Sequence, residues 1–429
     1  MKFSQFNSMI SLSENLELIY NSYSDSYLII SKKYLPLSDI ESIKNKYPEV
    51  YNKLVESKCI IDHDINEVDL VKELQNSVDN NNKDFILTIN PTLDCNFKCW
   101  YCYESHVKKS KIDPETLLKI KHLIYNVIAT QKGIQHLQLN FFGGEPLLQY
   151  QIVLEIIKYA ENICETNKKD ISVAFTTNGY LLNQERLDTL SKYHVNTMQI
   201  TLDGDRRTHD KIRFSSQKLG SYDRIIENIK NILRKKKIYI TLRLNYTSEN
   251  IDCMGNIVED LLDLEDEEKK YLIVHFYRVW QDSEGEDISD LVKNTISKFR
   301  EYGFKSYKYP LNNVRVSCYG DKTYAALVNY NGDVYRCTAV DFQKQRRDGY
   351  IDDEGVIVWE NNSFEERKNA KFKNKPCLSC RLLPICNGGC TQHALRHKDE
   401  DYCIFNFDER KKDEAILNKL DIHLKYENF

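Results

Sequence analysis

The sequence predicts an α/β protein in three parts: a small α+β unit over residues 1–84, a parallel sheet covered by helices over residues 85–309, and a cysteine-rich region over residues 310–429. Three observations carry this prediction. Apolar runs alternate with amphipathic stretches from residue 85 onward, the alternation stops after residue 309, and seven of the thirteen cysteines lie beyond that point. We expect the last region to be organised by bound metal more than by an apolar core of its own.

The N-terminal part alternates short apolar runs with helical patterns. Leu16–Tyr20 and Tyr27–Ile30 have the length and composition of strands, and the periodicity predicts helices over Asp39–Ser57 and Asn66–Val78. The polar stretch Asp79–Asp84 that follows is typical of a linker. These residues therefore form a unit separate from the main sheet.

The central part contains six strand-and-helix pairs. The predicted strands are Phe85–Ile89, Leu137–Phe142, Ile171–Thr176, Thr197–Leu202, Ile238–Leu244 and Leu272–Val279. The predicted helices are Pro114–Ile128, Leu148–Cys164, Gln184–Lys192, Tyr222–Arg234, Met254–Leu264 and Ile288–Tyr302. Such a succession indicates a parallel sheet covered by helices, either an open sheet or a partial barrel. One more amphipathic helix is predicted near the end, over about Glu409–Leu420.

Charge and hydropathy exclude several classes of protein. The 429 residues carry 60 Lys and Arg against 64 Asp and Glu, a net charge of −4, so neither nucleic acid nor an anionic membrane is expected as a partner. No apolar run approaches the roughly 20 residues that span a bilayer. The N-terminal stretch lacks the pattern of a secretory signal, so we expect a cytoplasmic protein. There, thirteen cysteines are better explained by metal or cluster ligation than by disulfides.

Three cysteines follow the first predicted strand on one loop, at Cys95, Cys99 and Cys102, with no fourth cysteine nearby. A structural zinc site needs four closed ligands, whereas three thiolates on a cubane cluster leave one iron open to bind and activate a small molecule. The open iron is the functional interpretation. The alternative is a zinc site that borrows a distant ligand.

Polar or glycine-rich turns follow the next three predicted strands, at Phe141–Pro146, Thr176–Gly179 and Thr201–Gly204. Parallel β/α proteins bind their ligands at the C-terminal ends of strands. Each of these three sequences, taken alone, is most often an ordinary turn without a ligand. Three in succession beside the cysteine loop indicate a ligand site.

The CxxxCxxC spacing of the loop resembles the signature of radical S-adenosylmethionine (SAM) enzymes, and we predict a partial (β/α)6 barrel for the central part. The resemblance implies a [4Fe-4S] cluster on Cys95, Cys99 and Cys102 whose open iron chelates SAM, which is then split into methionine and a 5′-deoxyadenosyl radical. The sequence GGEP implies contacts of Gly143, Gly144 and Glu145 with the SAM ammonium. Further SAM contacts are implied for Tyr101 at the adenine, Asn178 and Thr201 at the ribose, and Arg213 at the carboxylate; the last three have the alternative of being turn or surface residues.

The cysteines of the last region are Cys318, Cys337, Cys377, Cys380, Cys386, Cys390 and Cys403. Zinc sites favour paired CxxC knuckles with four thiolates each, and an odd set of seven with one such pair fits zinc poorly. Their spacing resembles the seven-cysteine SPASM extension of radical SAM peptide-modifying enzymes. That resemblance implies two auxiliary [4Fe-4S] clusters: an outer one on Cys377, Cys380, Cys386 and Cys403, and an inner one on Cys318, Cys337 and Cys390.

Two departures from the family pattern bear on the reaction. Residues 301–317 lack a further cysteine found in several relatives, so the inner cluster either keeps an open iron, which could bind a substrate thiolate, or takes an oxygen ligand such as Asp321. Sulfatase maturases usually carry an aspartate after the position of Cys337, where this chain has Thr338 and its nearest downstream carboxylate is Asp341. The remaining cysteines, Cys59, Cys164 and Cys253, are expected to be buried free thiols.

The resemblance implies an enzyme that modifies a ribosomally made precursor peptide, by a thioether or carbon–carbon crosslink or by epimerisation. It uses three [4Fe-4S] clusters, SAM and a low-potential donor such as flavodoxin or ferredoxin. The N-terminal unit, with strands at Leu16–Asn21 and Tyr27–Ser31, is similar to leader-peptide recognition domains, which bind a peptide by edge pairing; a purely structural role is the alternative. The two other functions considered are a formylglycine-generating sulfatase maturase and a non-catalytic, zinc-bound peptide scaffold.

Overall fold

The computed structural model describes residues 1–34, 39–214, 220–282, 287–308, 311 and 313–426. The chain forms two compact units, each made of separate segments. Unit 1 comprises residues 1–81, 310–323 and 362–429, and unit 2 comprises residues 82–309 and 324–361. The predicted boundary at residues 309 and 310 lies outside the described residues.

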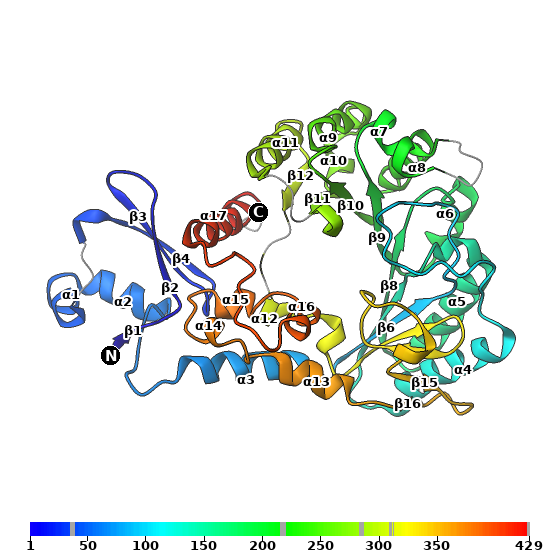
Figure 1. Cartoon of the computed structure of the whole chain (residues 1–429), viewed down its shortest axis with the longest axis horizontal. Helices are drawn as coiled ribbons and strands as arrows, with labels where there is room; N and C mark the ends of the chain where they lie inside the picture. The colour runs from blue at the N-terminus through cyan, green and yellow to red at the C-terminus, as the bar shows by residue number, and fades with distance from the viewer. Residues whose placement is uncertain (35–38, 215–219, 283–286, 309–310, 312, 427–429) are drawn as a thin grey trace. The chain divides into compact units, whose positions relative to one another are not determined.

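Unit 2 is built on one sheet of eleven strands (Figure 1). Seven of them run parallel in chain order: β6 (Asp84–Asn90), β7 (His136–Phe141), β8 (Asp170–Thr177), β9 (Val195–Leu202), β10 (Tyr239–Tyr246), β11 (Leu272–Arg278) and β12 (Lys305–Lys308). The six predicted strands are confirmed as β6 to β11. The sheet is open, with β12 at one edge, as the predicted partial barrel requires.

Helices connect these strands and cover the sheet with their apolar faces. They are α4 (Pro114–Tyr125), α5 (Tyr150–Thr166), α6 (Gln184–Leu190), α7 (Arg206–Ile212), α8 (Tyr222–Arg234), α9 (Ile251–Met254), α10 (Asp266–Lys269) and α11 (Ser289–Glu301). In Figure 1, α5, α6 and α8 run along the same side of the strands. Buried residues of strands and helices, such as Leu139, Ile200 and Ile229, form one apolar core. The loops that follow the C-terminal ends of the strands lie outside this core and can carry polar groups.

Residues 324–361 extend the same sheet beyond β6. Their strands are β13 (Ala325–Asn329), β14 (Asp333–Tyr335), β15 (Gly349–Ile351) and β16 (Ile357–Trp359). Strand β13 pairs in parallel with β6, and the other three follow antiparallel. All five side chains of β13 are buried, so this stretch has an apolar core, which differs from the expectation for the region after residue 309.

The N-terminal part of unit 1 is a three-stranded antiparallel sheet beside helices. Its strands are β2 (Asn7–Ser11), β3 (Leu16–Asn21) and β4 (Ser26–Ser31), and β1 (Lys2–Phe3) pairs with β5 (Ile60–Ile61). The two strands predicted from sequence are β3 and β4. The predicted helix over Asp39–Ser57 is broken into α1 (Ile40–Lys46) and α2 (Pro48–Glu56), because Pro48 has no N–H to continue the first helix. Helix α3 (Glu67–Asp79) closes the segment.

The C-terminal part of unit 1 consists of short helices around cysteines and one long helix. These are α12 (Asn313–Val316), α13 (Ser363–Ala370), α14 (Lys375–Leu378), α15 (Leu383–Cys386), α16 (Thr391–Arg396) and α17 (Glu409–Tyr426). Leu18 and Tyr20 of β3 share a buried cluster with Leu382, Ile385 and Ile416. The N-terminal sheet and the C-terminal helices therefore form one body, a different grouping from the three predicted parts. No helix among the described residues is long and apolar enough to span a bilayer.

Candidate active site

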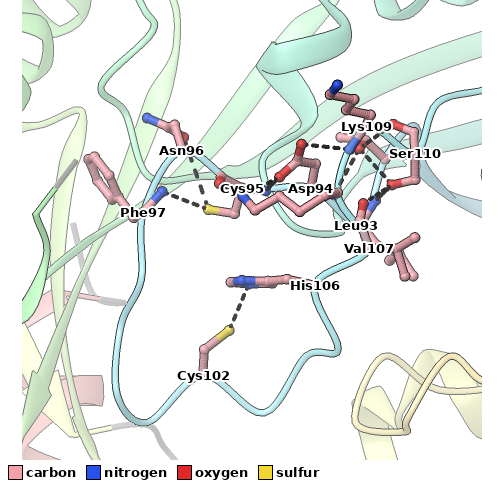
Figure 2. A network of polar contacts seen from close by, with 12 residues as sticks. Leu93, Asp94, Cys95, Asn96, Phe97, Cys102, His106, Val107, Lys109 and Ser110 are labelled. Atoms are coloured by element: carbon pink, nitrogen blue, oxygen red, sulfur yellow. Dashed lines mark hydrogen bonds and ion pairs between the residues drawn. The ribbon is translucent and has the colours of Figure 1, made fainter. Parts of the chain in front are cut away.

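The loop between β6 and α4 is closed by its own polar side chains (Figure 2). The Asp94 carboxylate accepts hydrogen bonds from the backbone N–H of Cys95 at 2.9 Å and of Lys109 at 2.8 Å, and Lys108 Nζ lies 2.7 Å from it. Leu93 N donates to Ser110 Oγ at 2.9 Å. These bonds join the two ends of the loop, so the cysteine triplet is held on a fixed base.

The turn after β7 packs directly against this base. Gly144 N donates to Thr92 O at 3.1 Å, and Glu145 N donates to Asp94 O at 2.9 Å. A Cβ atom on Gly143 would lie 2.4 Å from Thr92 O, and one on Gly144 would lie 2.3 Å from Asp94 O. Gly143 also has a φ of +104°, a backbone conformation that residues other than glycine rarely adopt. The two glycines are therefore needed for the close approach of the two loops.

A cavity of about 320 Å³ lies at the C-terminal ends of the central strands of unit 2. It brings together nearly all the residues predicted for the cluster and for SAM. These are Cys95, Cys99, Cys102, Tyr101, Gly143, Gly144, Asn178, Thr201 and Arg213. Among the residues predicted to contact SAM, Glu145 is the exception, because it does not line the cavity.

Cys95 and Cys99 are half-buried and Cys102 is exposed, and partial desolvation disfavours the thiolate at all three positions. Burial raises the pKa of the Cys95 thiol to about 12 and that of Cys102 to about 11, and it also raises the pKa of Cys99. A bare thiolate is therefore unfavourable in this cavity, and a cationic iron cluster would supply the missing counter-charge. His106 Nε2 lies 3.5 Å from Cys102 Sγ, so it is placed to contact a ligating sulfur (Figure 2). The donor set fits a cluster.

A buried polar network fixes the loop from the far side of the cavity. Arg213 Nε forms an ion pair with Asp203, and Arg213 also donates to the Tyr101 hydroxyl at 2.6 Å. The Tyr101 hydroxyl donates to Asp203 Oδ1 at 2.5 Å, and Asn245 Nδ2 lies 3.1 Å from it. Burial raises the pKa of the Tyr101 phenol well above its ordinary value, so this group stays a hydrogen-bond donor. Tyr101 is thereby tied to the ends of β9 and β10.

Glu145 has a supporting place that differs from its predicted contact with the SAM ammonium. Its side chain is fully buried and accepts hydrogen bonds from Leu147 N at 3.0 Å, Asn178 N at 2.8 Å and Thr177 Oγ1 at 2.8 Å. The carboxylate is thus occupied by protein donors. It positions the end of β8, and with it the Asn178 side chain, which faces the cavity and donates to Asn96 Oδ1 at 2.8 Å.

Several residues in the cavity wall or next to it were not predicted as site residues. Asn245 lies at the end of β10, so extending the strand-end rule to the fifth strand would have found it. Asp203 lies in the turn after β9, but its ion pair with Arg213 depends on helix α7, which was not predicted. Glu104 lines the cavity, and its Oε2 atom is buried with no hydrogen-bond partner among the described residues. Burial raises the pKa of Glu104 to about 8.

In unit 1, the four cysteines predicted for the outer auxiliary cluster line one small cavity of about 30 Å³. They are Cys377, Cys380, Cys386 and Cys403, which we call the outer cysteine group. Cys390 is exposed and directly precedes α16, and Cys318 directly precedes the turn that contains Asp321. Cys337 belongs to unit 2 and is buried. The grouping of Cys318, Cys337 and Cys390 stays a prediction.

Asp321, considered as an oxygen ligand for the inner cluster, is already fully engaged. Its buried carboxylate lies 2.8 Å from Arg367 and 3.2 Å from Lys371 Nζ, and it accepts a hydrogen bond from Thr391 Oγ1 at 2.6 Å. Both oxygens therefore have protein partners. A role as cluster ligand would require breaking these bonds, so the contacts argue against Asp321 as that ligand.

The three remaining cysteines lie outside both cavities. Cys59 and Cys164 are buried as expected, whereas Cys253 is half-buried beside Thr208 Oγ1. Across the described ranges, no three His, Cys, Asp or Glu side chains are grouped closely enough to hold a single metal ion.

Comparison with known proteins defines the class. Residues 89–261 match the model of the radical SAM superfamily, and they include the cysteine loop, the Gly143–Gly144 turn and the network around Arg213. With the open parallel sheet and the cavity at its strand ends, this match indicates a radical SAM domain over residues 89–261.

Particular relatives cover most of the chain. The radical SAM cyclopropyl synthase TigE of Paramaledivibacter caminithermalis is 23% identical over 87% of this chain and 79% of its own length. A cysteine-type anaerobic sulfatase-maturating enzyme of Clostridium novyi is 24% identical over 70% of this chain and 86% of its own. The structure of Streptococcus suis SuiB bound to its precursor peptide SuiA superposes with a TM-score of 0.54 at 17% identity, covering 94% of this chain and 98% of SuiB.

Proposed function

We propose that this chain is a peptide maturase that cleaves SAM and uses the resulting radical to crosslink a residue of a ribosomally made precursor peptide. The observation that carries the proposal is the single cavity that holds the three cysteines of the loop together with Gly143, Gly144 and Arg213. When bound there, a reduced [4Fe-4S] cluster supplies the electron that splits SAM into methionine and a 5′-deoxyadenosyl radical.

The residues of the chain bind and orient SAM. The backbone at Gly143 and Gly144 can approach the amino group closely because no side chain intervenes. Arg213 keeps its charge at the cavity because Asp203 and Tyr101 fix its guanidinium, and it attracts the carboxylate. Asn178 and Thr201 offer polar groups at neighbouring strand ends for the ribose.

Two auxiliary [4Fe-4S] clusters belong to the same proposal. The outer cysteine group supplies four thiols from one cavity, which suits a fully ligated cluster. The second cluster is assigned to Cys318, Cys337 and Cys390 and keeps an open iron, which could bind a substrate thiolate. A low-potential flavodoxin or ferredoxin reduces the enzyme, and a cytoplasmic location keeps the thiols reduced.

The substrate is a peptide, and the N-terminal sheet is its docking element. Strands β2 and β4 each pair with β3 alone, so each presents an unpaired edge among the described strands to which an extended leader can add. Support comes from SuiB, whose structure is described as bound to its precursor peptide. The crosslink is a thioether or a carbon–carbon bond. Its formation removes two hydrogen atoms from the peptide, one as the atom taken by the radical and one as a proton and an electron.

Formylglycine formation is the second candidate, and the similarity to a sulfatase-maturating enzyme favours it. The cavity argues against it, because Thr338 and Ala339 line the wall and no carboxylate follows Cys337 there. The Asp341 carboxylate accepts a hydrogen bond from Ser105 at 2.8 Å and lies outside the cavity lining. A crosslinking reaction therefore fits the lining better.

The deciding experiment is anaerobic reconstitution of the full chain, followed by assays of iron, sulfide, zinc and 5′-deoxyadenosine. We expect about twelve irons per chain, no zinc, and SAM cleavage after reduction. C99A should abolish cleavage, whereas the matched variant C253A, which removes a thiol outside the cavity, should not. Stoichiometric zinc with little iron, or 5′-deoxyadenosine from C99A, would overturn the proposal. A peptide product that carries an aldehyde would instead establish the sulfatase-maturase function.

A further inference from the structure

The outer cysteine group is surrounded by hydrogen-bond donors. Asn374 Nδ2 lies 2.9 Å from Cys377 Sγ, and Leu382 N lies 3.5 Å from Cys380 Sγ. The Cys386 sulfur is approached by the backbone N–H groups of Gly388 and Gly389, both in left-handed conformation. Three of the four sulfurs therefore face N–H groups supplied by the surrounding chain.

The orientation of the Asn374 amide is fixed by a second contact. Its Nδ2 also donates to Tyr402 O at 2.7 Å, and its Oδ1 accepts from Tyr402 N at 3.3 Å. A flipped amide would place its oxygen against Tyr402 O and lose both bonds. The N–H of Asn374 is thus held toward the Cys377 sulfur by the strand-like pairing with Tyr402.

A cation completes the surroundings. Lys412, in the first turn of α17, lines the same cavity as the four cysteines and is only 8% exposed. Its Nζ pairs with Glu409 Oε1 at 2.6 Å, but Glu409 is 63% exposed and shares its carboxylate with Arg381 at 2.9 Å. Arg381 also pairs with Asp413 at 2.8 Å, so Lys412 is the charged group of this set that lines the cavity, while the opposing Glu409 carboxylate lies outside the lining and is screened by water.

We infer that Asn374 and Lys412 raise the reduction potential of the cluster held by the outer cysteine group. The inference rests on the proposed function, which places a cluster at these cysteines. Reduction adds one electron, and hence one negative charge, to the cluster. N–H groups that point at its sulfurs and a nearby ammonium stabilise that added charge, more so in a poorly solvated site. Such a cluster is suited to accept an electron that the substrate loses.

The test compares variants of the full-length, reconstituted chain in which C95A, C99A and C102A together remove the catalytic cluster. Redox titration followed by electron paramagnetic resonance then reports the auxiliary clusters. In this background K412M should make reduction of one cluster at least tenfold less favourable, a shift of about 59 mV to more negative potential. N374A should shift the same signal in the same direction, and K412R should restore the parent value.

Lys411 provides the matched control. It carries the same charge on the neighbouring, exposed position of α17, so K411M should leave the potential unchanged. An unchanged potential in K412M and N374A at full iron content would overturn the inference, as would an equal shift in K411M. If K412M loses iron, N374A decides by the same criterion, and loss of the cluster in both variants would also overturn it. An unmodified chain with only about four irons would instead refute the proposed auxiliary cluster.

Discussion

The contact between the glycine turn and the cysteine loop leads to a quantitative prediction for Gly144. In G144A the new Cβ would lie 2.3 Å from Asp94 O, and real Cβ atoms essentially never approach closer than 3.0 Å, so the loops must separate by at least about 0.7 Å. The obstacle is backbone, which cannot rotate away as a side chain could. The separation would break two hydrogen bonds, Gly144 N to Thr92 O and Glu145 N to Asp94 O. We expect a loss of about 2–4 kcal/mol in unfolding free energy.

The functional effect should be local and larger. Cys95 follows Asp94 directly, so a displaced Asp94 moves the first cluster ligand, and the loop should no longer assemble its cluster. On the proposed three-cluster composition, iron should fall from about twelve to about eight per chain, and 5′-deoxyadenosine production should cease. The assays are iron analysis, SAM cleavage and urea unfolding monitored by circular dichroism.

Gly255 supplies the control. Its φ of −64° suits alanine, and the nearest atom to an added Cβ is the flexible Lys298 side chain at 3.1 Å. G255A should keep full iron and activity. If G144A also kept full iron and SAM cleavage, the argument from close approach would be wrong.

Three further predictions concern buried polar groups. E145Q should lower the unfolding free energy by about 2 kcal/mol, because the amide cannot accept from all the donors that the carboxylate accepts, and urea titration measures this. D321N should cost about 3–5 kcal/mol, since it leaves the buried cations Arg367 and Lys371 without their shared partner. His209 is buried and its pKa is held well below the ordinary value by desolvation and by the nearby arginine, so its contribution to stability is complete above about pH 6.5 and is lost as the pH falls below that value. H209Q should flatten this part of the stability profile, measured by urea unfolding between about pH 8 and 5.

The two carboxylate variants each have a matched comparison on an exposed position of the same unit. E185Q, on α6, should leave the unfolding midpoint unchanged, and D62N should do the same for unit 1. An effect of E145Q or D321N no larger than its control would show that the buried contacts contribute little. A stability profile of H209Q that is as steep as that of the parent would assign the acid sensitivity to other groups.

The strands of the main sheet were predictable because each is an apolar run bounded by turn residues, and the chain order dictates parallel neighbours. Strand β12 was missed because Lys305–Lys308 lies at the edge of the sheet and is largely polar. Strands β13 to β16 were missed for another reason. All four are short, and β13 joins the sheet by pairing with β6, which lies more than 200 residues earlier, so no local pattern reveals that this segment extends the sheet.

Some features of the site were also predictable from the sequence, and others were not. The cysteine loop and the glycine turn could be recognised because their residue types and spacing are dictated by the chemistry they serve. The position of the Glu145 side chain could not be predicted. A glutamate looks the same in a sequence whether its carboxylate faces a ligand or accepts hydrogen bonds from buried protein donors. The Tyr101–Asp203–Arg213 network joins three separate loops and becomes visible only when the strand ends are brought together.

The segmented composition of the two units has a consequence for synthesis. The chain passes between them at residues 81, 309, 323 and 361, so neither body is encoded by one continuous stretch. On the ribosome, the sheet of unit 2 cannot receive its last strands until about residue 361 has emerged, and the first 81 residues must wait for the cysteine helices near the C-terminus. A gene fragment that stops at residue 309 would therefore leave both bodies incomplete.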